Sequence, residues 1–258
     1  MTDTPANPVR NAVAGLGTAT WLVWRAAAGL GADLVRADGF AARRFASALV
    51  DYLWRPSPVV AALGLLVGLI TGVLSATALK VYHADFLVLP VAAKIMAGQI
   101  APLLVGIFAA GRVSVALAAR LGAMRLSGEI DALELRGFEP SRFVVAPILA
   151  TTLVAAPVLA VAAALSEMVG AGFVLQYEGV ITWSRYFELV ITPDTADQTL
   201  RAIFKGGVFF LLSVAAGATA GSVALDGPRA LERRTTAAFT GGLLSIFATA
   251  ALLAALWK

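Results

Sequence analysis

The charged side chains that could do chemistry are concentrated in one stretch of this sequence, residues 111–147. Five arginines and four acids lie within it: Arg112, Arg120, Arg125, Arg136, Arg142, Glu129, Asp131, Glu134 and Glu139. Carboxylates can bind metal ions, but the acids of residues 127–137 have the spacing of a helix surface. They fall on an exposed side, and the opposite side consists of Leu126, Ile130 and Leu133. The stretch therefore predicts a short amphipathic helix rather than a metal site.

The ends of this helix are also predicted. Ser127 can cap its N-terminus, because a serine hydroxyl accepts a backbone N–H at that position. The early acids suit the positive end of the helix, and Gly137 is suited to end it. A helix of this kind between two apolar segments could dock a soluble protein, and a plain connecting loop is the alternative.

The sequence lacks the residue sets on which membrane enzymes depend. It has one histidine, His83, and no cysteine, and neither HExxH nor GxSxG occurs. A lone histidine in a polar turn is most simply a solvated side chain. No GxxxxGK[ST] phosphate loop is present for holding ATP. We therefore expect no catalytic, cofactor or metal site in this chain, and an intramembrane lipid-modifying enzyme is disfavoured.

Composition places these residues in a membrane protein. The chain has 258 residues, of which 59% are hydrophobic and 14% charged, and its mean hydropathy is +0.84. About 20 apolar residues are needed for a helix to cross the hydrocarbon layer. Five such spans are predicted: 59–79, 86–110, 143–174, 203–224 and 237–257. The predicted fold is an all-α integral membrane protein with one five-span domain, residues 59–258.

The segment before the first span, residues 1–58, is expected to be cytoplasmic or interfacial. Residues 33–54 have a helical period, with apolar residues on one face and Arg36, Arg43 and Arg44 on the other. This pattern favours an amphipathic helix in the headgroup layer, and an ordinary soluble-domain helix is the alternative. The N-terminus lacks the pattern of a signal peptide. The net charge of +4 is too small to indicate a nucleic-acid partner.

Two groups of residues within the spans are singled out. Gly64, Gly68 and Gly72 recur every four residues, which predicts close helix–helix packing. The alternative is that these glycines reflect only the general abundance of glycine in membrane helices. The polar or helix-bending residues at membrane depth are Lys94, Gln99, Pro102 and Glu167. Such groups usually face the protein interior or a water-filled cavity. The alternatives are that Lys94 extends to the interface and that Glu167 already lies near it.

Basic residues predict the orientation of the chain. With a cytoplasmic N-terminus, residues 1–58, 111–142 and 225–236 are inside, and they hold 14 of the 20 lysines and arginines. The sequence therefore predicts a cytoplasmic N-terminus, a C-terminus on the opposite side, and a cytoplasmic connector at residues 111–142.

The connector also carries a family resemblance. Its runs GRVSVALAARLGAM, EIDALELRGFEP and RFVVAP, together with PRALERRTT near the C-terminus, resemble the MlaE/YrbE permeases. These are permease subunits of ABC transporters that act with MCE-domain proteins in lipid trafficking. The resemblance extends from the amphipathic helix to the end of the chain.

The resemblance implies an N-terminal elbow helix, five spans, and pairing with an identical or different second permease subunit around a lipid pocket in the inner membrane. It implies that ATP and Mg²⁺ are held by a separate ABC ATPase, and that a phospholipid or related lipid is exchanged with an MCE-domain protein. EIDALE is similar to the family's coupling helix, so the coupling residues are Ser127, Glu129, Ile130, Asp131, Leu133, Glu134 and Arg136. The lipid-pocket candidates are Lys94, Gln99, Pro102 and Glu167.

Departures from the family pattern fall mainly in the second span. Gly98 and Gln99 stand where the family usually has an Arg-Glu pair, Arg120 stands where glutamate is usual, and Ile148 where arginine is usual. Lys94, one helical turn before Gly98, is a candidate to replace the lost positive charge. A non-transporting membrane scaffold that docks a soluble cytoplasmic partner is the alternative function.

Overall fold

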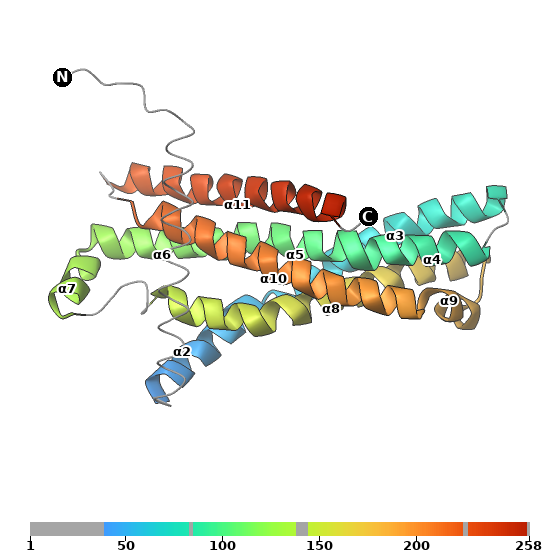
Figure 1. Ribbon diagram of the computed structural model, residues 1–258, viewed down its shortest axis with the longest axis horizontal. Coiled ribbons are helices and arrows are strands. Elements are labelled where there is room, and N and C mark those ends of the chain that lie inside the picture. The colour runs from blue at the N-terminus through green and yellow to red at the C-terminus, as the bar shows by residue number, and fades with distance from the viewer. Residues whose placement is uncertain (1–38, 83–84, 138–143, 224–226, 257–258) are drawn as a thin grey trace, which may run out of the picture. The chain divides into compact units, whose positions relative to one another are not determined.

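The computed structural model describes residues 39–82, 85–137, 144–223 and 227–256, which form helices joined by short turns and contain no strand (Figure 1). Five of the described helical stretches are long and apolar enough to cross a membrane: Phe45–Val81, Leu87–Leu126, Ala146–Tyr177, Pro193–Gly221 and Arg229–Leu256. The predicted all-α fold with five spans is confirmed. Outside the described residues lie His83, Glu139, Arg142 and residues 33–38 of the predicted amphipathic helix.

The first described elements are α2 (Gly39–Leu49), the π-helical turn η1 (Val50–Trp54) and α3 (Ser57–Tyr82). Together, α2 and η1 cover the described part of the predicted amphipathic helix, and within α2 Arg43 is exposed while Ala48 is buried. A new helix begins beside Pro58, because proline suits the first turn, where its missing N–H is not needed.

The second membrane stretch consists of consecutive helical segments. These are α4 (Asp85–Ile95), η2 (Met96–Ile100), α5 (Ala101–Ala109), η3 (Ala110–Ser114) and α6 (Val115–Leu126). The segments η2 and η3 are π-helical turns, which are frequent at functional sites. Helix continues well past the predicted end of the span at Ala110, because Leu117, Ala118 and Leu121 are buried at helical spacing while Arg120 is exposed.

The remaining elements are α7 (Glu129–Leu135), α8 (Ala146–Tyr177), α9 (Trp183–Val190), α10 (Pro193–Gly221) and α11 (Pro228–Leu256). Both α10 and α11 begin well before their predicted spans. The start of α10 is explained by its cap, since the Thr195 N–H donates to Thr192 Oγ1 at 3.3 Å and Pro193 follows directly. Residues 175–202, which lie between the third and fourth predicted spans, therefore contain α9 and the first turns of α10.

The described residues belong to two compact units. The first comprises residues 39–48, 110–151 and 211–245, and the second comprises residues 49–109, 152–210 and 246–256. In the first unit, two glycines of α10 allow close backbone contact. A Cβ added at Gly217 would lie 2.8 Å from the Ser114 Cα, and one added at Gly221 would lie 3.1 Å from the Ala118 Cα.

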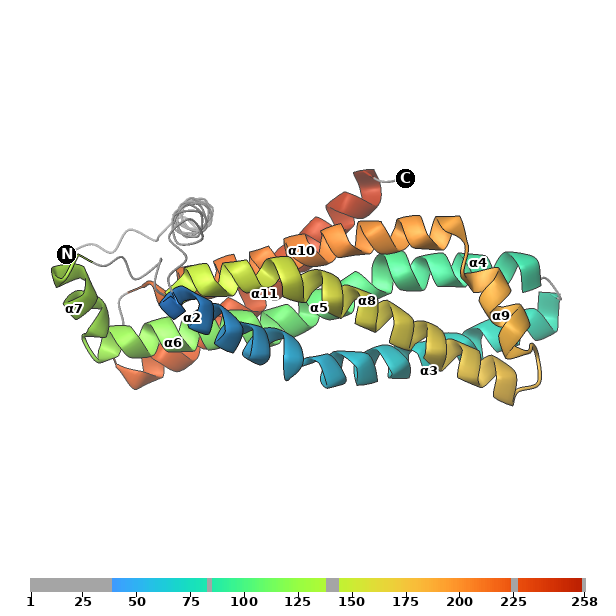
Figure 2. The same ribbon diagram turned by 90° about the horizontal axis from the view of Figure 1, so that it is seen from below.

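In the second unit, α3 packs against α8 through the three glycines singled out from the sequence (Figure 2). A Cβ added at Gly68 would lie 2.8 Å from the Glu167 Cα, and one added at Gly72 would lie 2.9 Å from the Ala171 Cα. At Gly64 it would lie 2.9 Å from a backbone carbonyl oxygen of α8. Small residues every four positions thus allow the two backbones to approach closely.

The short helix α9 also packs on α8 in the second unit. Tyr186 is buried, and its hydroxyl donates to the Met168 carbonyl oxygen at 2.9 Å. The ring of Trp183 stacks on Phe187, with centroids 5.5 Å apart. Gly172 lies beneath Trp183 and Tyr186, where a Cβ would clash with both rings. Trp183, Tyr186 and Phe187 are therefore packing residues of α9.

Candidate functional site

The helix α7 forms the tip of the connector, in the first unit (Figure 1). It ends as predicted: Gly137 has a φ of 77°, and its N–H donates to the Glu134 carbonyl oxygen at 2.9 Å. Among the predicted apolar residues, Ile130 is buried, Leu133 is half-buried and Leu126 is exposed. The short helix predicted from the spacing is confirmed over Glu129–Leu135. Only one of the three apolar residues predicted for its inner side is buried.

The prediction that Ser127 caps α7 is wrong. Its backbone N–H donates to the Ala123 carbonyl oxygen at 3.0 Å, and its Oγ donates to the Met124 carbonyl oxygen at 3.2 Å. Ser127 therefore ends α6, because that helix extends to Leu126. The residue before α7 is Gly128, which has a φ of 74°, a left-handed conformation that glycine adopts without strain.

The outer surface of α7 combines charge with an exposed apolar side chain. Glu129, Asp131, Glu134 and Arg136 are exposed, and Leu135 has 90% of its surface accessible. An apolar side chain so fully exposed among acids is suited to a protein contact, where the leucine can be buried and the acids can face basic residues.

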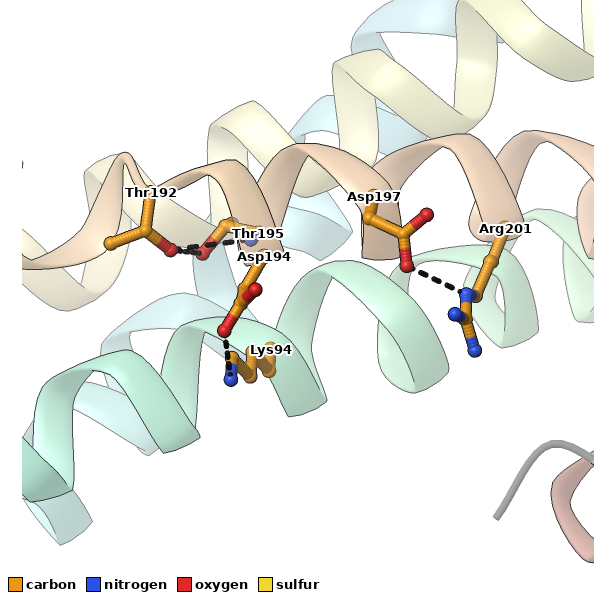
Figure 3. Close-up of polar contacts among 6 residues, drawn as sticks. All are labelled: Lys94, Thr192, Asp194, Thr195, Asp197 and Arg201. Carbon is orange, nitrogen blue, oxygen red and sulfur yellow. Dashed lines mark hydrogen bonds and ion pairs between the residues drawn. The ribbon is translucent and has the colours of Figure 1, made fainter.

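The second unit contains a row of polar contacts along α10, and one of the ion pairs joins α10 to the second membrane stretch. Lys94 of α4 points toward Asp194 in the first turn of α10, and Nζ and Oδ2 lie 2.7 Å apart (Figure 3). One turn further along α10, Asp197 pairs with Arg201 at 2.8 Å (Figure 3). Both pairs are largely exposed, so they place a group of charges at the surface of this end of the unit.

Lys205 lies one turn beyond Arg201 on α10 and is buried, with 3% of its surface accessible. Its Nζ donates to the Gly98 carbonyl oxygen and to Gln99 Oε1, each at 2.9 Å. Gly98 and Gln99 both belong to the π-helical turn η2. A buried ammonium in a membrane-spanning helix requires strong partners, and these two oxygens supply part of what it needs.

The same turn is in close contact with a second side chain of α10. A Cβ added at Gly98 would lie 2.5 Å from Gln198 Oε1, so only glycine fits there without movement of that glutamine. Pro102 lies one turn after Gly98 and is buried. The structure therefore brings Gln99 into contact with Lys205, a residue that was not among the predicted site residues.

Glu167 occupies a different environment, on α8. It is completely buried, and neither carboxylate oxygen has a hydrogen-bond partner among the described residues. Its backbone is the part of α8 that contacts Gly68. The position is within the helix packing of the second unit, where an ionised carboxylate without a partner would be strongly disfavoured.

The residues that sequence reasoning missed share a helix face. Asp194, Gln198, Arg201 and Lys205 recur at intervals of four, three and four residues, which is the spacing of one face of an α-helix. The signal was therefore present in the sequence. It is easily missed because the charges of this segment resemble those of a loop and the predicted fourth span begins only at residue 203.

No group of three or more histidine, cysteine, aspartate and glutamate side chains is arranged to hold a metal ion in the part of the chain that the structure describes. The polar groups of the second unit are instead paired cations and oxygens. These contacts join α4 and η2 to α10.

The chain is similar in sequence to a family of membrane permeases. The sequence model of the family "Permease MlaE" matches residues 45–256. A probable ABC transporter permease protein of Rickettsia bellii is 24% identical over 190 residues, which cover 73% of both chains. One of Synechocystis is 26% identical over 149 residues, covering 58% of this chain and 57% of the relative. The match to the family extends over nearly the whole described region, and the chain belongs to the MlaE permease family of ABC transporter membrane subunits.

Proposed function

We propose that this permease subunit moves a phospholipid or a related lipid between the inner membrane and an MCE-domain protein, driven by a separate ABC ATPase that binds ATP and Mg²⁺. The observation that carries the proposal is Lys205. An ammonium with only 3% of its residue surface accessible in a membrane-spanning helix, with Arg201 one turn away, is suited to attract the phosphate of a lipid headgroup. Gln99 and Lys94 add polar groups along the same helix pair.

Lys205 also accounts for a departure from the family pattern. The second span has lost the usual Arg-Glu pair at Gly98 and Gln99, and Lys94 was the predicted substitute for its positive charge. Lys94 is engaged with Asp194, while Lys205 contacts both Gly98 and Gln99. We infer that Lys205 supplies the positive charge of the lipid site from the fourth span.

We further propose that the N-terminus and α7 are cytoplasmic, that the C-terminus is on the opposite side, and that α7 couples the chain to the ATPase. The distribution of basic residues supports the orientation. The exposed acids and Leu135 of α7 support the coupling role. The MCE-domain protein and a second, identical or different, permease subunit rest on the family resemblance.

Lipid analysis of the purified transporter tests the proposal. The chain is purified with its ATPase in detergent, and the bound lipids are identified by mass spectrometry. We expect phosphate-bearing lipids to be enriched relative to the source membrane, and K205M to lose most of this enrichment. The control is K80M, because Lys80 lies in an exposed ion pair with Glu178. A lipid content equal to that of the membrane in every sample would contradict the proposal.

A further inference from the structure

Lys205 of α10 contacts the backbone of the second membrane stretch close to Pro102. A proline inside a helix has no N–H to donate, and its ring crowds the carbonyl four residues earlier. For Pro102 that carbonyl belongs to Gly98. Lys205 Nζ donates to this same oxygen at 2.9 Å. A side chain of α10 thus provides the hydrogen bond that Pro102 cannot.

The local helix geometry fits this role. The π-helical turn η2 ends directly before α5, in which Pro102 is the second residue, and the Ala101 N–H donates to the Met96 carbonyl oxygen, five residues earlier. Membrane helices accommodate proline through such π adjustments and through side chains that satisfy the freed backbone groups. The second membrane stretch has both: η2 is the π adjustment, and Lys205 is the side chain that donates to the freed Gly98 carbonyl.

Close packing surrounds this contact, and an accessible residue lies beside it. Gly98 is held against Gln198, where a Cβ would lie 2.5 Å from Oε1. One turn after Pro102, a Cβ added at Gly106 would lie 3.1 Å from the Phe209 Cβ. The helices are therefore packed closely on both sides of Pro102. Gln99, by contrast, is exposed, so the second oxygen bound by Lys205 belongs to an accessible residue.

We propose that Lys205 is a positioning residue that acts in two ways: it replaces the hydrogen-bond donor missing at Pro102, and it is drawn from the Gly98 carbonyl by a lipid phosphate that enters past Gln99. The second half rests on the proposed function. Because a phosphate forms charge-assisted hydrogen bonds, which are stronger than a bond to a neutral carbonyl, it can compete for the ammonium. Release of the Gly98 carbonyl then loosens the helix at η2. The π-helical turn beside Pro102 therefore responds to occupation of the lipid site.

The first half is tested by a double-mutant cycle of K205M and P102A, because the alanine of P102A has an N–H that can bond to the Gly98 carbonyl. We expect K205M to lower the thermal midpoint of the full chain in detergent by about 5 °C when Pro102 is present. In the P102A background the same substitution should have little effect. Equal effects of K205M in both backgrounds would overturn the positioning role, since the two residues would then act independently. K80M serves as the control for loss of a lysine.

The second half is tested by lipid binding. The chain has no cysteine, so I107C can carry a single environment-sensitive fluorophore. Ile107 is exposed on α5, the helix that follows η2. Dioctanoyl-phosphatidylglycerol should change the fluorescence of the chain that keeps Lys205, whereas dioctanoylglycerol, which lacks the phosphate, should not. With K205M the response should be lost.

The P102A variant separates binding from the helix response. Its Gly98 carbonyl no longer depends on Lys205, so we expect it to bind dioctanoyl-phosphatidylglycerol about tenfold more tightly than the chain with Pro102, measured by thermal shift, but with a much smaller fluorescence change. Weaker binding by P102A, or an undiminished fluorescence change, would overturn the competition. Absence of binding to the chain with Pro102 would contradict the proposed function, while leaving the thermal cycle to decide the positioning role.

Discussion

Lys94 of α4 and Asp194 of α10 form an ion pair, with Nζ and Oδ2 2.7 Å apart. The aspartate stands in the first turn of α10, where its negative charge also complements the positive end of the helix. Lys94 therefore joins the start of α10 to the second membrane stretch. This leaves Lys205, a residue buried deeper on α10, as the cation beside Gly98 and Gln99.

The contribution of the Lys94–Asp194 pair to stability can be tested by swapping the two charges. K94D places two like charges together and should lower the thermal midpoint slightly, since exposed pairs contribute little. K94D/D194K should recover only part of the loss, because a lysine at position 194 lies at the positive end of α10. The differences should shrink at high salt, where exposed charges are screened. A K94D effect that does not change with salt concentration would mean that Lys94 acts through packing.

Close packing of α3 on α8 predicts that Gly68 does not tolerate a larger residue. A Cβ at this position would lie 2.8 Å from the Glu167 Cα. G68A should therefore destabilise the chain by about 1–3 kcal/mol, the usual cost of overpacking. The measurement is thermal or denaturant unfolding in detergent.

The matched control is Gly241 on α11, where an added Cβ would meet no atom within 4 Å. G241A should be neutral or slightly stabilising, because alanine has less freedom to lose on folding. Equal losses of stability at Gly68 and Gly241 would show that helix packing is not what distinguishes the two positions.

Tyr186 predicts a dependence of stability on alkaline pH. Burial raises the pKa of its phenol above the ordinary value of 10.0. The folded chain therefore keeps the phenol neutral where the unfolded chain ionises it. The contribution of the neutral Tyr186 phenol to the free energy of unfolding is complete below about pH 10 and is lost as the pH rises above that value.

Y186F should remove this pH dependence and also the hydrogen bond to the Met168 carbonyl oxygen. We expect a loss of about 1 kcal/mol at neutral pH and a flatter decline of stability between about pH 9 and 11. The check is the thermal midpoint measured across that range. The interpretation fails if the two chains decline in parallel.

The outer surface of α7 is the proposed contact with the ABC ATPase, so a charge reversal there should disrupt binding of the ATPase. E129K/E134K reverses two exposed charges beside Leu135 and should abolish co-purification with the ABC ATPase, while the permease itself remains folded. The control is E178K/E188K, which reverses two exposed acids outside α7, one after α8 and one on α9. Retention of the ATPase by E129K/E134K would exclude α7 as the coupling helix.

The sequence was sufficient for the elements whose signal is local. Long apolar runs predicted five spans, and the spacing of Leu126, Ile130 and Leu133 before Gly137 predicted α7. The glycine register predicted a packing face on α3, although the partner helix, α8, could not be identified, because a pattern of small residues does not specify what it packs against.

The polar contacts of α10 were beyond the sequence analysis for a physical reason. The charges at Asp194, Asp197 and Arg201 resemble those of a loop, and only the cap formed by Thr192 and Thr195 extends the helix through them. Ser127 was assigned to the wrong helix because α6 continues past the predicted span. Both errors arose at helix ends, where a few hydrogen bonds decide the boundary.

Lipid transfer by the reconstituted complex tests the central claim most directly. The permease and its ATPase are placed in liposomes with a fluorescent phospholipid, and transfer to or from the soluble part of the MCE-domain protein is measured with and without ATP. The account predicts ATP-dependent transfer that K205M reduces strongly, that E129K/E134K abolishes and that K80M leaves intact. ATP hydrolysis that proceeds normally without any lipid transfer would contradict it.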